Sequence, residues 1–147
     1  ALATPEARHL SILGSGAVAL AHLHYVKDLR PWQSIRLYSP TLASKPAEEL
    51  AQLQALDPRL QLVPELEAAV DDADVIMLCT SSAGPAIDPR TLHKPALITS
   101  ISTNAPRAHD VPPAALPELQ VYCDYRRTTP GPAGEMLIAG EHHGWDS

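Results

Sequence analysis

The chain of 147 residues contains no phenylalanine, and aromatic residues make up only 4% of it. Its core must therefore consist mainly of leucine, isoleucine, valine and alanine. Apolar residues reach 45%, which is ordinary for a globular protein. At this length we expect a single domain with a sizeable core, and the 15 prolines indicate many short loops.

Cysteine is also scarce. Cys79 and Cys123 both lie in apolar, strand-like stretches, where a thiol usually serves as a small hydrophobic side chain. Two thiols without neighbouring ligands form neither a disulfide framework nor a zinc site. His22 and His24 are two residues apart on a predicted helix and point to different faces, so they cannot chelate one metal ion. The acidic cluster at 71–74 is too short for a calcium loop, and no metal site is expected.

Basic residues are the minority, with 11 Lys and Arg against 17 Asp and Glu, a formal charge of −6. Because no basic block occurs, nucleic acid and anionic membranes are poor candidate partners. No apolar run approaches the roughly 18 residues that span a bilayer, and the first residues lack the pattern of a signal peptide, so we expect a cytoplasmic location. The sequence also has no lysine-bearing phosphate loop and no G-x-S-x-G motif, which argues against an NTPase or a hydrolase.

Residues 9–19 (HLSILGSGAVA) predict a short buried strand that runs into a glycine turn and a helix. The spacing Gly14-x-Gly16-x-x-Ala19 fits the dinucleotide fingerprint. In that motif the first glycine makes the turn, the second admits a pyrophosphate, and the small third residue lets the helix pack on its strand. An ordinary strand-to-helix turn is the alternative reading of this spacing.

Strand-like and helix-like stretches alternate along the rest of the chain. The other expected strands cover residues 34–39, 60–63, 74–80, 96–101 and 120–124. The expected helices cover residues 17–30, 45–56, 64–70 and 134–139, with shorter helical turns at 89–92 and 112–116. This alternation predicts an α/β fold with a doubly wound, mainly parallel sheet of about six strands, in which ligands bind beyond the carboxyl ends of the strands.

The second strand ends without the carboxylate that usually holds the adenosine ribose of NAD. Ser39 and Thr41 stand there instead, and Lys45 follows. Hydroxyl groups with a lysine suit a 2′-phosphate, so the sequence favours NADP over NAD. The alternative is that Lys45 is only a solvated residue at the start of a helix.

Five ordered motifs support a family resemblance. They lie at residues 10–19 with 21–23, 35–39, 73–76 with 80–82, 101–106, and 121–124 with 133–135. With these motifs the chain resembles the cofactor-binding domain of the ornithine cyclodeaminase/μ-crystallin family over nearly its whole length. The resemblance is closest to the branch that reduces pyrroline-2-carboxylate and other cyclic ketimines.

The resemblance implies that residues 1–147 form an NAD(P)-binding Rossmann domain. The substrate and dimerisation domain would lie outside this chain, and the full-length protein would be a homodimer acting on a small imino or amino acid. The pyrophosphate would be bound by Gly14, Ser15, Gly16, Ala17, Val18 and Ala19. The ribose groups and the nicotinamide would be bound by Ser39, Thr41, Lys45, Thr80, Ser81, Ser82, Thr103 and Asn104.

Asn104 occupies the position at which cyclodeaminases of this family carry a catalytic aspartate. An amide does not exchange a proton near neutral pH, so the resemblance implies hydride transfer to a cyclic imine such as Δ1-pyrroline-2-carboxylate rather than cyclodeamination. The alternatives are a true cyclodeaminase and a μ-crystallin-like binding protein without significant turnover. Asp124, at the end of the last expected strand, is read either as a structural cap or as a catalytic group.

Overall fold

The computed structural model describes residues 2–81, 84–101 and 107–140. The described residues fall into two compact units. The first unit comprises residues 2–80 and 92–100, and the second comprises the remaining described residues. No helix in these ranges is long and apolar enough to cross a membrane.

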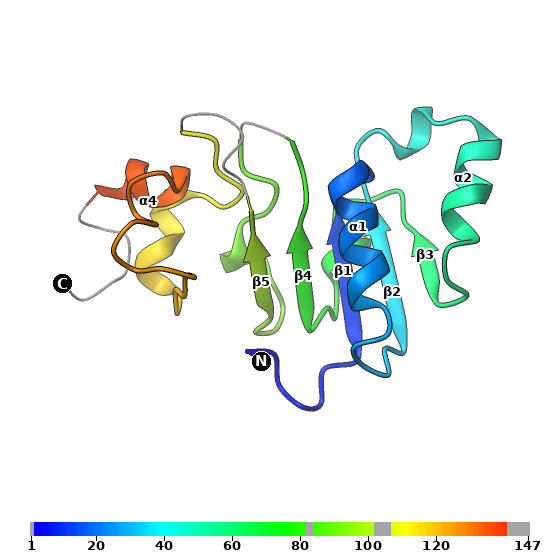
Figure 1. The fold of residues 1–147 in the computed structure, drawn as a ribbon, viewed down its shortest axis with the longest axis horizontal. Coiled ribbons are helices and arrows are strands. Elements are labelled where there is room, and N and C mark those ends of the chain that lie inside the picture. The colour runs from blue at the N-terminus through cyan, green and yellow to red at the C-terminus, as the bar shows by residue number, and fades with distance from the viewer. Residues whose placement is uncertain (1, 82–83, 102–106, 141–147) are drawn as a thin grey trace. The chain divides into compact units, whose positions relative to one another are not determined.

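The first unit contains a sheet of five parallel strands in the order β3-β2-β1-β4-β5 (Figure 1). The strands are β1 (His9–Leu13), β2 (Ser34–Tyr38), β3 (Leu60–Leu62), β4 (Val75–Leu78) and β5 (Leu97–Ser100). The order runs outward from β1 in both directions, which is the arrangement of a doubly wound α/β domain. The predicted parallel α/β fold is thus confirmed.

The central strand β1 is buried on both faces. Leu10 and Ile12 on one face and Leu13 on the other are at most 1% exposed, and Leu10 lies beside Ile35 of β2 and Val75 of β4. Strands that are covered on both faces of a parallel sheet read as continuous apolar runs, which is why the sequence pattern located this strand. Burial of these side chains holds β1 in place, so the turn that follows it starts from a rigid support.

The first helix is shorter than the sequence predicted. α1 (Ala17–Val26) ends four residues before Arg30, where the predicted helix stops. The carbonyl of Val26 accepts hydrogen bonds from the Leu29 N–H at 3.2 Å and from the indole N–H of Trp32 at 2.9 Å. Because a side chain from the returning loop bonds to the helix end, the chain turns back toward the sheet there.

The second helix is also shorter than predicted, and a proline explains the difference. The expected helix at 45–56 is α2 (Ala47–Gln54), which is preceded by a 3₁₀ turn, η1 (Leu42–Ser44). Lys45 has an extended backbone (φ −76°, ψ 144°) because the proline at position 46 disfavours a helical residue before it. α3 (Leu66–Val70) follows β3 and lies close to β1 and β2.

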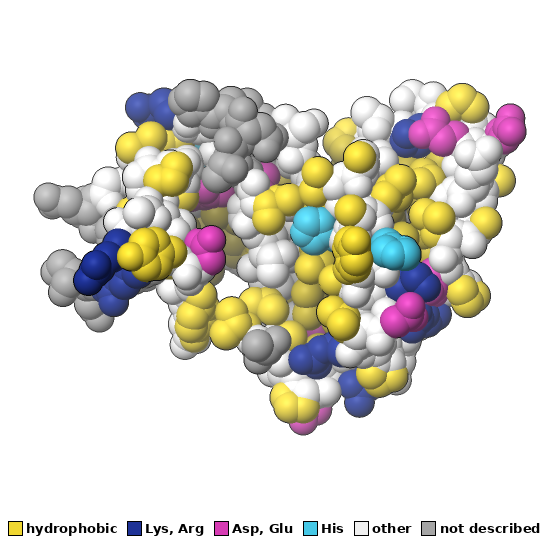
Figure 2. Space-filling view, in the orientation of Figure 1, with side chains coloured by type: hydrophobic (Ala, Val, Ile, Leu, Met, Phe, Trp, Pro, Cys, Tyr) yellow, Lys and Arg dark blue, Asp and Glu magenta, His cyan; other side chains and the backbone are white. Residues whose placement is uncertain are grey.

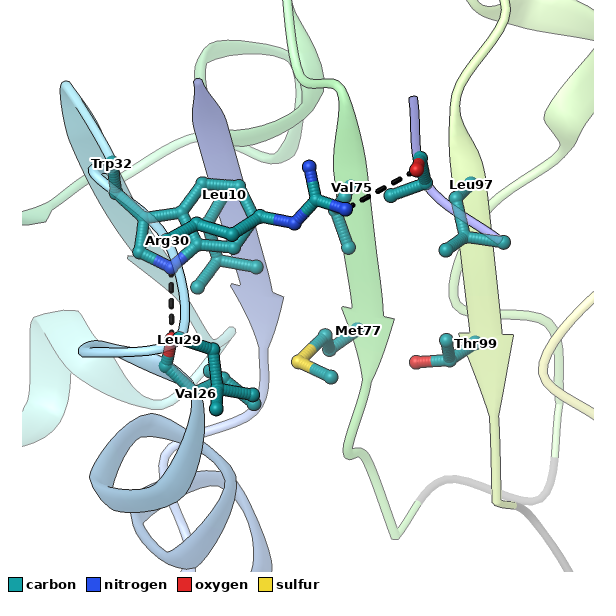
Figure 3. A pocket seen from close by; sticks show the side chains of 10 residues that line it. Leu10, Val26, Leu29, Arg30, Trp32, Val75, Met77, Leu97 and Thr99 are labelled. Carbon is teal, nitrogen blue, oxygen red and sulfur yellow. Dashed lines mark hydrogen bonds between the residues drawn. The ribbon is translucent and has the colours of Figure 1, made fainter. Parts of the chain in front are cut away.

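One face of the sheet carries an apolar groove beside α1. Figure 3 shows its lining, which combines the end of α1 and the following loop with side chains of β1, β4 and β5. The lining residues are Ala3, Leu10, Val26, Leu29, Arg30, Trp32, Val75, Met77, Leu97 and Thr99. The guanidinium of Arg30 donates to the Thr4 carbonyl at 2.6 Å and to the Ala3 carbonyl at 3.2 Å, which fixes the first residues along the groove. Hydrophobic side chains are plentiful on this face in the space-filling view (Figure 2).

The amino ends of the strands are joined by one carboxylate. Asp74 accepts hydrogen bonds from the backbone N–H groups of Arg8 at 2.7 Å and His9 at 2.9 Å. Its other oxygen accepts one from the Lys94 ammonium at 2.8 Å, and Lys94 also pairs with Asp72 at 2.8 Å. The beginnings of β1, β4 and β5 are thereby tied together at the edge of the sheet opposite the carboxyl ends.

The second unit contains three short helical elements: the 3₁₀ helices η2 (Pro89–Thr91) and η3 (Pro113–Glu118), and α4 (Gly134–Ala139). Asp110 and Glu135 are both buried, and the Asp110 N–H donates to the Glu135 carboxylate at 2.8 Å. This bond holds the first turn of α4 against the segment before η3.

The predicted strand at 120–124 is wrong, so the sheet has five strands in the described part of the chain rather than about six. Tyr122 is 63% exposed, and the described residues of this segment are not assigned to a strand. A strand depends on hydrogen bonds from a neighbour, which local β-propensity does not supply. Asp124 instead accepts hydrogen bonds from the Tyr125 N–H at 2.9 Å and the Thr129 hydroxyl at 3.0 Å.

Candidate functional site

The carboxyl ends of β1, β2 and β4 meet at one edge of the sheet. The Gly14 N–H, directly after β1, donates to the carbonyl of Tyr38 at the end of β2 over 2.7 Å. The Cys79 N–H, directly after β4, donates to the carbonyl of Leu13 over 2.8 Å. These two hydrogen bonds bring three loops together, at the place where doubly wound sheets bind their ligands.

Gly14 makes a turn that only glycine fits. Its φ is +130°, and a Cβ built there would lie 2.4 Å from the carbonyl oxygen of Cys79. Any side chain would therefore collide with the backbone after β4. The first glycine of the predicted motif has the role that the sequence pattern assigned to it.

The start of α1 is open. Gly16 is its N-cap residue, and among the described residues, its chain neighbours aside, no atom lies within 4 Å of the position of a Cβ there. Gly16, Ala17 and Val18 are exposed, whereas Ala19 is fully buried against the core. The first N–H groups of a helix have no partner within it, so this end offers hydrogen bonds and a positive dipole to an anion. These residues fit a pyrophosphate group.

The loop after β2 contributes hydroxyl groups. Ser39 is 9% exposed, and its Oγ lies 3.0 Å from the Oγ1 of Thr41. The Ser44 hydroxyl donates to the Thr41 carbonyl at 2.9 Å, which steadies the turn. Two adjacent hydroxyls next to a glycine turn suit the hydroxyls of a ribose.

Lys45 closes the same loop and is not free. Its ammonium donates a hydrogen bond to the carboxylate of Glu49, and its side chain is only 19% exposed. The reading of Lys45 as a merely solvated residue is therefore incomplete, because it belongs to an ion pair. Glu49 was not among the site residues predicted from the sequence, although charged residues spaced by four, as Glu49 is from Lys45, often form ion pairs on helices.

The other predicted residues are distributed as follows. Ser15 lies between the two glycines, and Thr80 follows Cys79 at the end of β4; both are half-buried. Ser81 is exposed and belongs to the second unit, as does Asp124. The predicted site residues Ser82, Thr103 and Asn104 lie outside the described residues.

Metal ligands do not gather in the described ranges, where no three His, Cys, Asp or Glu side chains are placed to hold an ion. The ring of His22 makes a hydrogen bond with the Val18 carbonyl at 2.8 Å, and the ring of His24 packs edge-on against Tyr25. The site at the strand ends is therefore described by backbone N–H groups, hydroxyl groups and one ion pair.

The sheet order and the glycine turn define a Rossmann-type α/β domain. Comparison with known families identifies it further: the chain belongs to the ornithine cyclodeaminase/mu-crystallin family, whose model matches residues 1–143. The predicted family resemblance is thus confirmed.

Two curated relatives differ strongly in their similarity to this chain. The NAD(P)H-dependent anabolic L-arginine dehydrogenase of Pseudomonas aeruginosa is 61% identical over 145 residues, which are 99% of this chain and 45% of the relative. The Δ1-pyrroline-2-carboxylate reductase of Paracoccus denitrificans is 27% identical over 141 residues, 93% of this chain and 43% of the relative. The chain thus spans less than half the length of either.

Two solved structures support the fold. The iminosuccinate reductase of Paracoccus denitrificans in complex with NAD⁺ superposes with a TM-score of 0.78 at 20% identity, over 95% of this chain and 43% of that one. The probable ornithine cyclodeaminase of Bordetella pertussis superposes with a TM-score of 0.82, also at 20% identity, over 99% of this chain and 46% of that one.

Proposed function

We propose that this chain is the NAD(P)-binding domain of an oxidoreductase that interconverts an α-amino acid and the corresponding imino acid. The observation that carries the proposal is the open start of α1 at Gly16, placed where the ends of three strands meet. The 61% identity with an NAD(P)H-dependent dehydrogenase supports it. The cofactor would supply hydride transfer at the nicotinamide, and the protein would bind and orient it.

Each part of the site has a role in this proposal. The glycine turn and the N–H groups of residues 16–19 bind the pyrophosphate, and Ser39 and Thr41 bind the adenosine ribose. Thr80, Ser81 and Ser82 would follow the second ribose, and Thr103 and Asn104 the nicotinamide. The site accepts NADP, and NAD as the alternative.

The proposed substrate is an amino or imino acid. The comparisons change which class of substrate we favour, cyclic or open-chain. The family resemblance, with an amide at position 104, favoured a cyclic imino acid such as Δ1-pyrroline-2-carboxylate. The much higher identity with an arginine dehydrogenase than with a pyrroline-carboxylate reductase supports an open-chain substrate, L-arginine first. The cyclic imino acid is the second candidate, and cyclodeamination is disfavoured by an amide at position 104.

The part of the full-length protein that lies outside this chain would bind the substrate. The chain covers 45% of the arginine dehydrogenase. We propose that residues 1–147 are one domain of the full-length protein, that a further domain binds the substrate and forms a homodimer, and that the isolated chain binds cofactor without turnover.

Calorimetric titration of the chain with NADPH and NADH tests the cofactor site. We compare the wild type with Gly16→Asp, whose carboxylate would occupy the pyrophosphate position, and with Gly131→Asp as a control at an exposed glycine of the second unit. Binding that disappears only in Gly16→Asp supports the proposal. Binding that survives this change, or no binding by the wild type, contradicts it.

The substrate is tested with the full-length protein by following nicotinamide absorbance. L-Arginine oxidation and Δ1-pyrroline-2-carboxylate reduction are measured side by side. Turnover of arginine supports the first candidate, and turnover of the cyclic imine alone supports the second. Tight cofactor binding with no turnover of either would favour the μ-crystallin-like alternative.

A further inference from the structure

We propose that Glu49 sets the preference of this site between NADPH and NADH by pairing with Lys45. The proposal rests on the proposed function, since it concerns the same dinucleotide site. It assigns to Glu49 the role of weakening the attraction of Lys45 for a 2′-phosphate, so that the site takes both dinucleotides.

The pair is built into the loop by the backbone. The proline at 46 keeps Lys45 extended and starts α2 immediately after it, which puts Glu49 in the first turn of that helix. The Lys45 ammonium donates to Glu49, whose side chain remains 45% exposed. Lys45 is thus held by its partner rather than extended freely into solvent.

The pair lies one short turn from the predicted ribose site. The Lys45 N–H donates to the Leu42 carbonyl at 3.1 Å, and the Ser44 N–H donates to the Thr41 carbonyl at 3.2 Å. These bonds close η1 between Thr41 and Lys45. In Figure 1 this segment passes above the carboxyl end of β2, which is hydrogen-bonded to the glycine turn through Gly14 and Tyr38.

NADPH and NADH differ strongly in charge at the 2′ position of the adenosine ribose. A phosphate monoester carries about 1.5 to 2 negative charges at neutral pH, whereas the ribose hydroxyl of NADH is neutral. Lys45 attracts the phosphate, and the carboxylate of Glu49 both occupies the ammonium and repels the phosphate. The ion pair therefore weakens the binding of NADPH and leaves NADH nearly unchanged.

The test compares the dissociation constants of NADPH and NADH at low ionic strength in the wild type and Glu49→Gln. The matched control is Glu48→Gln, which makes the same charge change at the neighbouring position, also in the first turn of α2. We expect Glu49→Gln to tighten NADPH binding about fivefold and to change NADH binding by less than about twofold. Glu48→Gln should move the ratio of the two constants by less than about twofold.

A double variant isolates the role of Lys45. In Lys45→Met with Glu49→Gln, the gain for NADPH should disappear, since the group that Glu49 holds is gone. Circular dichroism verifies that each variant is folded. The proposal is overturned if Glu49→Gln changes both dinucleotides equally, if Glu48→Gln has the same effect, or if the gain persists without Lys45.

The outcomes separate this proposal from the one it rests on. Binding of both dinucleotides with a ratio that Glu49→Gln leaves unchanged overturns the role of Glu49 and leaves the dinucleotide site in place. If the folded wild type and its variants bind neither dinucleotide, both proposals fail.

Discussion

Gly14 approaches the backbone of Cys79 so closely that a Cβ on the glycine would lie 2.4 Å from the Cys79 carbonyl oxygen. Its positive φ of +130° independently disfavours any L side chain. The approach joins the turn after β1 to the end of β4. Both the geometry of the candidate site and the packing of the sheet therefore require that residue 14 has no Cβ atom.

Replacing Gly14 by alanine should destabilise the fold, because the new methyl group must displace the chain after β4. We expect the free energy of unfolding in urea to fall by about 2 kcal/mol or more. Gly16→Ala is the control, since no described residue beyond its chain neighbours has an atom within 4 Å of its Cβ position, and it should cost at most about 1 kcal/mol. Equal costs for the two variants would contradict the close approach.

Two buried serines should respond in opposite directions. The Ser11 hydroxyl is fully buried in β1 and has no hydrogen-bond partner in the described part of the chain, whereas the Ser34 hydroxyl bonds to His9 Nδ1 at 2.8 Å. Ser11→Ala should raise the unfolding free energy by up to about 1 kcal/mol, because an unpaired buried hydroxyl is removed. Ser34→Ala should lower it by about 1 kcal/mol, again measured in urea. A lower unfolding free energy in both variants would show that the Ser11 hydroxyl makes a hydrogen bond in solution.

Acid should remove a stabilising interaction at Asp57. The Arg59 side chain bonds to this carboxylate at 2.8 Å and lowers the pKa of Asp57 to about 2, although burial opposes the shift. Because the folded pKa lies below the ordinary value of 3.8, the stabilisation is complete above about pH 4 and disappears as the pH falls toward 2. Asp57→Asn should cost about 2 kcal/mol at pH 7 and little at pH 2.

The control for this pH dependence is Asp28→Asn, because that side chain is 73% exposed and lies 3.7 Å from the same guanidinium. An exposed pair contributes little, so Asp28→Asn should change the unfolding free energy by less than about 1 kcal/mol. A pH-independent cost of Asp57→Asn would show that packing, rather than charge, accounts for its effect.

The second unit has a similarly close contact. A Cβ on Gly134, in the first turn of α4, would lie 1.7 Å from the carbonyl oxygen of Ala108. Gly134→Ala should therefore loosen α4 and expose nearby amides to hydrogen exchange, including that of Asp110. Gly131→Ala, whose Cβ would meet its nearest neighbour at an ordinary 3.5 Å, should leave exchange unchanged.

Much of the fold could be predicted because parallel strands read as apolar runs and because Gly14, Gly16 and Ala19 have fixed spacing. The ends of helices were predicted less well. α1 ends at Val26 because Trp32 bonds to its carbonyl, and that bond joins residues that only the folded chain brings together. The strand expected at 120–124 was wrong for a similar reason, since local β-propensity does not determine whether a segment joins a sheet.

In the candidate site, too, features encoded by neighbouring residues could be predicted, whereas contacts between distant residues could not. Local motifs located the glycine turn and the hydroxyls after β2, because each is encoded within a few residues. The close approach of Gly14 to Cys79 joins residues far apart in the chain and has no local signal. Glu49 had a local signal in its spacing of four residues from Lys45, but the bond between the two side chains became evident only from the structure.

The carboxylate of Asp74 joins the strand beginnings through bonds that involve none of the residues of the candidate site. The amino ends of the strands are thus held together independently of the loops at their carboxyl ends. Loops at the carboxyl edge can change sequence to suit another cofactor or substrate while the opposite edge keeps the strands in register. A protein engineer who exchanges the segment after β2 should accordingly leave Asp74 and Lys94 unchanged.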